Sequence, residues 1–369
     1  MTDGNVAKDR AQSPEVRKLA AHMVADHTKA NKELGEIGKK MGLGMDFNSG
    51  KARSFRKENF DGDYLATMES DHKAALQPKP RMAELPLVFM HIPKTAGTAV
   101  TAALSASLSP RHFVSGFDRV LFGEFNGFDT IDPALRQSIY LESKNLPANG
   151  NFVSGHISFS TLRHVYPVAQ YFTVLREPVS RLLSFWLYWR SQTESQLCSW
   201  GDWASYVKQS RGPVGEFLCR REIACTTDNL YVRMLVWPHP LIPENDFIDP
   251  RHDKTLVRLA LDHLGKFAFC DIVENPNLQA NIQKWLQRPF SLGVTNETSA
   301  TPGTQHKSLH EELTPEVHRA LEERTRLDLK IWAAAARQVG IADPESLCDL
   351  TLAKNIERHQ RAFTAAAGS

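Results

Sequence analysis

A short loop between an apolar run and an alanine-rich run carries the first residues with recognisable chemistry. The segment 87–100 reads LVFMHIPKTAGTAV, so a strand-like stretch gives way at a proline to a small-residue turn and then to a helix-like stretch. Such a turn can hold an anion, because exposed backbone N–H groups, a helix N-terminus and small side chains allow close contact with negative oxygens. The loop adds an ammonium group and two hydroxyls. Its candidate anion-binding residues are Lys94, Thr95, Ala96, Gly97 and Thr98.

The order of residues in this loop differs from the usual nucleotide-binding loop. In that motif, G-x-x-x-x-G-K-[ST], the lysine directly precedes a hydroxyl residue that binds magnesium. Here Lys94 opens the loop and Gly97 follows it. We therefore expect a ligand different from that of the usual motif.

A second strand–turn–helix unit reads QYFTVLREPVSRLLSFWLYW. Tyr171–Leu175 is predicted to be a strand, and an amphipathic helix is predicted to begin near Pro178. Arg176, at the end of the strand, can offer a forked pair of donors to a phosphate, or else form an ion pair with Glu177 or another acid. The hydroxyl of Ser184 can face the same pocket as Arg176 only if the chain between the two residues bends back. The alternative interpretation is that Ser184 is simply a small residue where the helix meets the sheet.

A histidine between these two units is the candidate general base. The segment NFVSGHISF begins like a strand, and His156 follows Gly155 where the strand is expected to break. The unperturbed pKa of histidine, about 6.5, suits proton abstraction near neutral pH. A histidine beside a glycine turn also serves as a structural hydrogen-bonding group. His91 and His164 are the competing candidates for the base.

The two units together resemble a known enzyme family. HIPKTAGT is similar to the 5′-phosphosulfate loop, and LREPVSRLLS to the 3′-phosphate motif, of sulfotransferases that use 3′-phosphoadenosine 5′-phosphosulfate (PAPS). GHISF resembles the segment of the 2-O-sulfotransferases that carries their histidine base. The resemblance covers about residues 85–340 and is nearest to the carbohydrate group that includes heparan sulfate 2-O-sulfotransferase.

The resemblance implies a role for each candidate residue. Lys94 and residues 95–98 would bind the 5′ end of PAPS, and Arg176 with Ser184 would bind its 3′-phosphate. His156 would take the proton of the acceptor hydroxyl, with an acidic residue as the alternative, because some PAPS-dependent enzymes use a glutamate as base. Lys94 would also stabilise negative charge on the leaving phosphate. A fixed ammonium can do this without a metal, so PAPS is expected as co-substrate and no metal is expected.

Two further segments resemble the family less closely. DNLYVRMLVW resembles a stretch near the acceptor or nucleotide, which points to Asn229 and Arg233, although its apolar residues equally suit a core helix. The Gly/Pro/Ser/Thr-rich loop SLGVTNETSATPGTQHKS falls where the family folds a segment over the nucleotide. It contains Asn296 and Lys307, and Lys307 is a candidate phosphate contact.

The elements that must position these residues alternate between strands and helices along the chain. This alternation predicts an α/β fold, a parallel sheet flanked by helices as in P-loop NTPases. A third strand is predicted within Lys266–Glu274, and the remaining helices at 99–108, 276–286 and 314–338. The expected domains are an N-terminal helical and irregular extension with linker, 1–84, a sulfotransferase domain, 85–340, and a C-terminal tail, 341–369.

The composition limits which binding partners and which cellular compartment we expect. The 369 residues carry 44 Lys and Arg against 42 Asp and Glu, a formal net charge of +2, which argues against a general nucleic-acid binder. The acceptor is expected to be a sugar or oligosaccharide. Because acidic residues almost equal the basic ones in number, it need not be a long anionic polysaccharide. Five cysteines without metal spacing are expected to be free thiols. With no signal-peptide pattern and no apolar run of membrane length, we expect a soluble, cytoplasmic protein.

Other functions and assemblies stay open at this point. Ser13 and Pro14 resemble a helix start, and the residues behind them form a weak heptad stripe, either a homo-oligomeric coiled coil or a helix lying on its own domain. One rival function is an ATP-dependent small-molecule kinase of related fold, which would require magnesium. The other is a non-catalytic nucleotide-binding protein that meets a partner through this helix.

Overall fold

The computed structural model describes the second of two compact units into which the chain divides. These units are Met1–Ala74 and Ala75–Ser369. The described residues are 76–123, 127–293 and 309–367, with Pro14, Lys18 and Ala21 as single residues of the first unit. The helix predicted from Ser13 lies, apart from those three residues, outside the described part of the chain.

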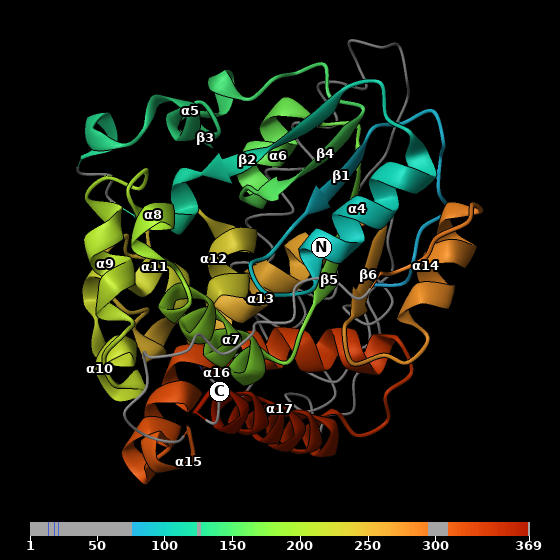
Figure 1. Ribbon diagram of the computed structural model, residues 1–369. Coiled ribbons are helices and arrows are strands. Elements are labelled where there is room, and N and C mark those ends of the chain that lie inside the picture. The colour runs from blue at the N-terminus through green and yellow to red at the C-terminus, as the bar shows by residue number, and fades with distance from the viewer. Residues whose placement is uncertain are drawn as a thin grey trace. The chain divides into compact units, whose positions relative to one another are not determined.

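A six-stranded sheet organises the second unit (Figure 1). Its strand order is β3-β2-β4-β1-β5-β6, and every pairing is parallel. The predicted α/β fold with a parallel sheet is confirmed. The strands are β1 (Leu87–Met90), β2 (Phe113–Asp118), β3 (Ile139–Tyr140), β4 (Phe152–His156), β5 (Gln170–Leu175) and β6 (Phe269–Ile272).

The central strand β1 shows why its sequence is apolar throughout. Alternate side chains of a strand point to opposite faces of the sheet, so a strand covered on both faces needs apolar residues at every position. Val88 and Met90 belong to one hydrophobic core, whereas Leu87 and Phe89 belong to another. A layer of helices therefore covers each face.

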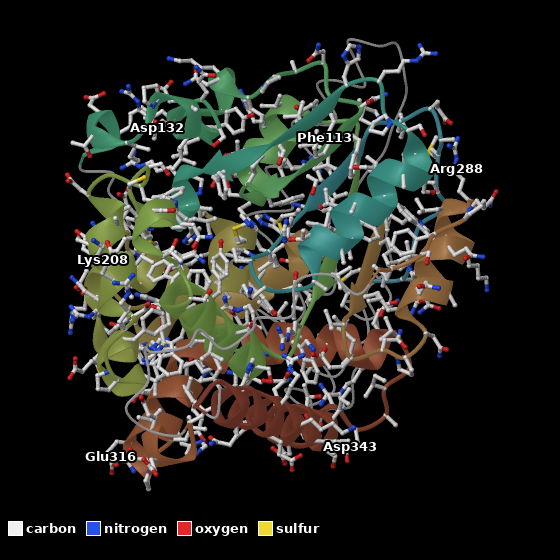
Figure 2. The ribbon with its side chains drawn as sticks, viewed as in Figure 1. Phe113, Asp132, Lys208, Arg288, Glu316 and Asp343 are labelled. Carbon is white, nitrogen blue, oxygen red and sulfur yellow. The ribbon has the colours of Figure 1, made fainter. Side chains whose placement is uncertain are left out.

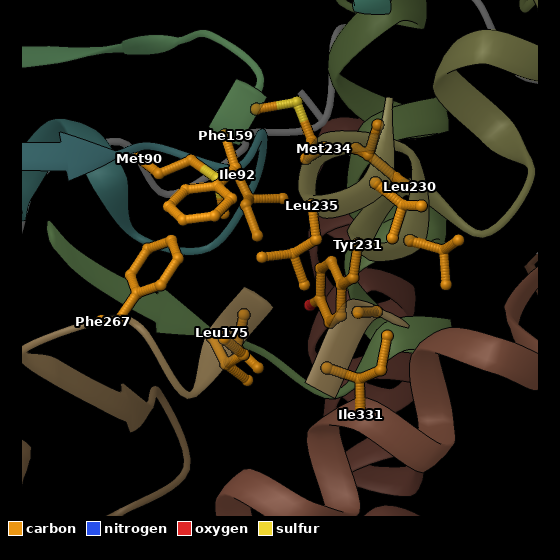
Figure 3. Close-up of a cluster of buried hydrophobic side chains, with 14 of the residues drawn as sticks. Met90, Ile92, Phe159, Leu175, Leu230, Tyr231, Met234, Leu235, Phe267 and Ile331 are labelled. Atoms are coloured by element: carbon orange, nitrogen blue, oxygen red, sulfur yellow. The ribbon is translucent and has the colours of Figure 1, made fainter. Parts of the chain in front are cut away.

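The two layers are made from different parts of the chain. The core around Leu87 and Phe89 is completed by α4 (Gly97–Leu108) and α14 (Leu278–Leu286). The core around Val88 and Met90 is completed by α6 (Phe159–Val165), α12 (Leu230–Val236), α13 (Asp253–Leu264) and α16 (Pro315–Gln338). Figure 3 shows this second core, with Tyr231 and Leu235 of α12 and Ile331 of α16 among its members.

A third core lies beside the sheet and consists of helices only. It is formed by α7 (Pro178–Arg190), α8 (Glu194–Leu197), α9 (Trp203–Gln209), α10 (Val214–Cys219), α15 (Leu309–Glu312) and the first part of α16. The long C-terminal helix α17 (Pro344–Ala367) packs against α7 and α16. Two short helices, α5 (Pro133–Arg136) and α11 (Ala224–Thr227), complete the set of α-helices in the described second unit, together with 3-10 turns at 119–121, 128–130, 143–145, 221–223 and 250–252.

Charges of both signs are spread over the outside of these elements. Figure 2 labels five exposed charged residues on separate helices or at their ends, Asp132, Lys208, Arg288, Glu316 and Asp343. None of the helices in the described part of the chain combines the length and apolarity that a membrane span would need.

The predicted elements agree with the structure where they rest on strong apolar patterns. The strands β1 and β5 and the helices α4, α7, α14 and α16 lie where the sequence predicts them, and Thr314 caps α16 by accepting from the N–H of Val317. The strand predicted within Lys266–Glu274 is shorter, because the chain is still turning after α13 until Phe269. The sequence does not predict the edge strand β3, which has only two residues, or its neighbour β2, whose sequence FVSGFD has no continuous apolar run.

The direction of the strands decides where a ligand can bind. Because all six are parallel, their carboxyl ends meet at one edge of the sheet, and β1 pairs with β4 on one side and β5 on the other. Ligands of open α/β sheets bind outside this edge, where connections diverge to the two sides. The chain leaves β1 into the Lys94 loop, ends β4 at His156 and leaves β5 into Arg176.

Candidate active site

A cavity of about 900 Å³ opens at the carboxyl edge of the sheet. Its volume is near the upper end of the range for small-molecule sites, about 300–1,000 Å³, so it has room for two substrates. Lys94, residues 96–98, His156, Arg176 and Ser184 all contribute to its lining. The fold therefore brings together almost every candidate residue from three separate segments of the chain.

The loop after β1 has a backbone suited to anions. Lys94 and Ala96 have positive φ angles of 68° and 61°. This left-handed conformation costs about 1–2 kcal/mol in residues other than glycine, and it forms backbone concavities whose N–H groups bind anions. Thr95 does not line the cavity, because its side chain is buried and its hydroxyl donates to the carbonyl of Ile92 at 2.9 Å. The Thr95 hydroxyl thus stabilises the loop.

The helix that follows the loop begins without an acidic partner. α4 starts at Gly97, has no side-chain cap on its first N–H groups and has no acidic residue in its first turn. Its partial positive charge therefore stays available to an anion. A Cβ atom at Gly97 would lie 1.8 Å from two ring atoms of His91. Only glycine allows the helix to begin directly against this imidazole.

Lys94 is a cation held close to other cations. Its Nζ lies 4.4 Å from the centre of the Tyr188 ring, and among the described residues it forms no ion pair with an acid. Burial, together with the charges of Arg176 and Arg358, lowers the pKa of Lys94 to about 8. Negative charge placed beside it would restore its ordinary pKa, so this ammonium favours an anionic ligand.

Arg176 is held by uncharged groups and not by Glu177. One Nη atom donates to the carbonyl of Lys94 at 3.2 Å and the other to Oδ1 of Asn355 at 3.1 Å. Glu177 instead caps α7, accepting from the N–H groups of Val179 and Ser180. The ion pair considered as an alternative is absent from the described residues, and the Arg176 guanidinium faces the cavity without a neutralising carboxylate bonded to it.

Ser184 reaches the same cavity because α7 starts directly after Arg176. Pro178 is the first residue of α7, and Glu177 at its cap turns the chain back toward the cavity. Ser184 and Tyr188 are four residues apart and share one face of the helix, and both line the cavity. The hydroxyl of Ser184 has no hydrogen-bond partner in the described part of the chain, so it is free for a ligand.

His156 is the last residue of β4, and one of its ring nitrogens is already engaged. Its Nδ1 lies 2.6 Å from the carbonyl oxygen of His91. A carbonyl can only accept, so Nδ1 carries a proton and Nε2 of the neutral ring keeps its lone pair. Burial lowers the pKa of His156 to about 4, and the Lys94 charge adds to this lowering. The imidazole is therefore neutral at pH 7 with Nε2 as its available base.

Of the two competing histidines, His91 also lines the cavity and His164 does not. The ring of His91 lies 4.2 Å from that of His156, packs under Gly97, and has a pKa lowered well below its usual value by burial. Its backbone carbonyl already orients His156, so His91 supports the loop. His164 lies in α6 and is not among the residues that line the cavity.

Three residues of α17 complete the cavity, and the sequence predicts none of them. Thr351, Asn355 and Arg358 are all part of the lining. Asn355 accepts from Arg176 and donates to Oγ of Ser180 at 3.1 Å, so it fixes the guanidinium to α7. Arg358 is a third cation whose charge acts on Lys94 and Arg176. No local pattern in residues 341–369 indicates where a C-terminal helix docks, so the sequence alone predicts only a tail there.

The weaker candidates Asn229 and Arg233 do not line this cavity. Asn229 is fully buried and bonds to Asp228 and to the N–H of Leu327 in α16. Arg233 forms a buried ion pair with Asp228 at 3.1 Å. The structure thus supports the core-helix alternative for this segment, which ties α12 to α16. Asn296 and Lys307 lie outside the described residues.

Two family models match adjacent parts of the chain. A family model described as Sulfotransferase family matches residues 83–332, more than half of the chain. A second model, described as a domain of unknown function (DUF4142), matches residues 1–84. No curated protein matches the chain. The cavity residues of α17 lie beyond the first of these matches.

Proposed function

Because the chain belongs to the sulfotransferase family, we propose that it transfers a sulfuryl group from PAPS to a hydroxyl group of an acceptor. The observation that carries the proposal is a group of cations at the start of α4. Lys94 and Arg176 line one cavity and form no ion pair with an acid among the described residues. The sequence resemblance predicts a carbohydrate hydroxyl, whereas the lining of the cavity favours a different acceptor, which is proposed in the next subsection.

The two ends of the donor would bind to different parts of this group. The 5′-phosphosulfate would lie on the loop, with Lys94 and the N–H groups at the start of α4. The 3′-phosphate would accept from Arg176, whose planar guanidinium suits bidentate contacts, and from Ser184. Asn355 would hold the guanidinium in place from the other side.

The chemical step needs one proton acceptor and one stabilised leaving group. As the acceptor oxygen forms its bond to sulfur, the hydroxyl proton passes to Nε2 of His156. The bond between sulfur and the bridging oxygen of the 5′-phosphate breaks, and that oxygen takes the electron pair beside Lys94. A base with a pKa of about 4 is weak, but the negative charge of bound donor offsets the Lys94 charge and raises the pKa of His156.

The donor assignment is tested by a thermal-shift titration that does not need the acceptor. Adenosine 3′,5′-bisphosphate and ADP are each added with and without magnesium. A ligand at about one hundred times its dissociation constant adds about 2.7 kcal/mol of apparent stability. We expect this stabilisation from the bisphosphate without magnesium. A preference for ADP with magnesium would contradict the proposal and favour a kinase.

Replacing a cation of the cavity should weaken bisphosphate binding, whereas replacing a neighbouring surface lysine should not. We expect Arg176→Ala and Arg358→Ala each to weaken bisphosphate binding by about tenfold or more, because each removes a charged contact to phosphate. Lys354→Ala is the matched control, since Lys354 lies on the same helix as Arg358, is exposed and does not line the cavity. Calorimetric titration measures all three, and equal affinities for Arg176→Ala and the wild type would refute the 3′-phosphate site.

The lowered pKa of Lys94 gives donor binding a specific pH dependence. The charged ammonium binds phosphate, and with a pKa of about 8 the free protein loses this charge as the pH rises through 8. We expect the bisphosphate affinity to fall by up to about tenfold per pH unit above that point. Lys94→Arg should remove the fall, because a guanidinium keeps its proton. Affinity of the wild type that is constant up to about pH 9.5 would contradict this role of Lys94.

A further inference from the structure

The half of the cavity away from the phosphate loop indicates which kind of hydroxyl compound fits, an inference that rests on the proposed sulfuryl transfer. This half is apolar and mostly aromatic. Its lining includes Phe117, Phe122, Leu135, Trp189, Trp200 and Trp203. All of these except Trp189 are only half-buried, so their apolar surface faces the cavity although the aromatic residues also pack against a core.

The aromatic rings form a continuous series that starts at the base. The ring centre of Phe117 lies 5.4 Å from that of His156, and Phe122 follows at 6.2 Å from Phe117. Trp203 lies 5.3 Å from Phe122, and Trp189 lies 6.1 Å from Trp203. A molecule whose hydroxyl reaches His156 therefore extends its body along these rings.

The charged groups of the cavity are all on the donor side. Among the described lining residues they are Lys94, Arg176, Glu274 and Arg358, with Glu274 and Arg358 both acting on Arg176. The polar residues near the aromatic series are uncharged, Ser191, Gln192, Gln196 and Thr226. An anionic polysaccharide needs Lys or Arg to bind its carboxylates or sulfates, and the aromatic half has none among its described lining residues.

We propose that the acceptor is a neutral alcohol or phenol with an apolar ring body. Its hydroxyl lies at Nε2 of His156, and its ring stacks along Phe117, Phe122 and Trp203. Apolar pockets with a few placed polar groups bind ligands of this kind, and edge-to-face or offset ring contacts orient them. The hydroxyl proton passes to His156, the oxygen–sulfur bond forms, and adenosine 3′,5′-bisphosphate leaves with the electrons of the broken bond.

The test measures transfer of ³⁵S from labelled PAPS to three acceptors by the full chain. These are 2-naphthol, the neutral disaccharide maltose and a uronic-acid polysaccharide. We expect kcat/KM for 2-naphthol to exceed that for maltose by about tenfold or more, with no transfer to the polysaccharide. Preference for either carbohydrate overturns the proposal.

A pair of variants in one strand locates the acceptor. Phe117 and Phe113 both belong to β2, but Phe113 is 47% exposed and does not line the cavity. Phe117→Leu should raise KM for 2-naphthol about fivefold and leave bisphosphate affinity unchanged. Phe113→Leu should change neither. Equal KM values in the two variants, with the bisphosphate still bound, would place the acceptor elsewhere.

The outcome remains decisive if no transfer to any of the three acceptors is seen. Binding of 2-naphthol to the bisphosphate complex is then measured by quenching of tryptophan fluorescence, which Trp200 and Trp203 can report. Binding that Phe117→Leu weakens supports the proposal, and absence of binding overturns it. If the bisphosphate itself does not bind, that is a separate result. It contradicts the proposed sulfuryl transfer and not the proposed acceptor class.

Discussion

The hydrogen bond between Nδ1 of His156 and the carbonyl of His91, 2.6 Å long, is the interaction on which the site depends. It connects the end of β4 to the start of the loop after β1, two strands that the sheet already pairs. The same bond assigns the proton to Nδ1 and leaves Nε2 as a base. Gly97 allows α4 to begin against the His91 ring, so the base, the loop and the helix N-terminus are fixed relative to one another.

The second constraint is electrostatic. Besides burial, the charges of Arg176 and Arg358 lower the pKa of Lys94, and the charge of Arg358 lowers the pKa of Arg176. No acid among the described residues forms an ion pair with these three cations. Such an arrangement is unfavourable in the free protein, because like charges repel and burial removes the hydration of Lys94 and Arg176. A ligand with two phosphate groups relieves both costs. Arg176 takes the carbonyl of Lys94 and the amide oxygen of Asn355 as its hydrogen-bond partners, while the nearby Glu274 charge acts on it without forming an ion pair.

The sequence predicts the donor half of the site far better than the acceptor half. The loop at Lys94 and the Arg176–Ser184 motif are contiguous stretches at strand ends, so local pattern is enough to find them. Arg358 comes from a C-terminal helix whose docking depends on tertiary packing against α7 and α16. Phe117 lies in a strand with a weak apolar pattern, and its neighbours in the aromatic series come from separate helices and loops. The sequence shows only that Asn229 is polar. Its hydrogen bond to the N–H of Leu327 in α16, inside the core, is visible only in the fold.

The central claim, that His156 is a neutral base with Nε2 available, is tested most directly by NMR of ¹⁵N-labelled histidines. The spectra are recorded between about pH 3 and pH 8, and His156→Gln identifies the resonances. The account predicts a protonated Nδ1, a pKa of about 4 in the free protein, and a higher pKa when adenosine 3′,5′-bisphosphate is bound. A free-protein pKa at or above the ordinary value of about 6.5, or a proton on Nε2 at neutral pH, would contradict it.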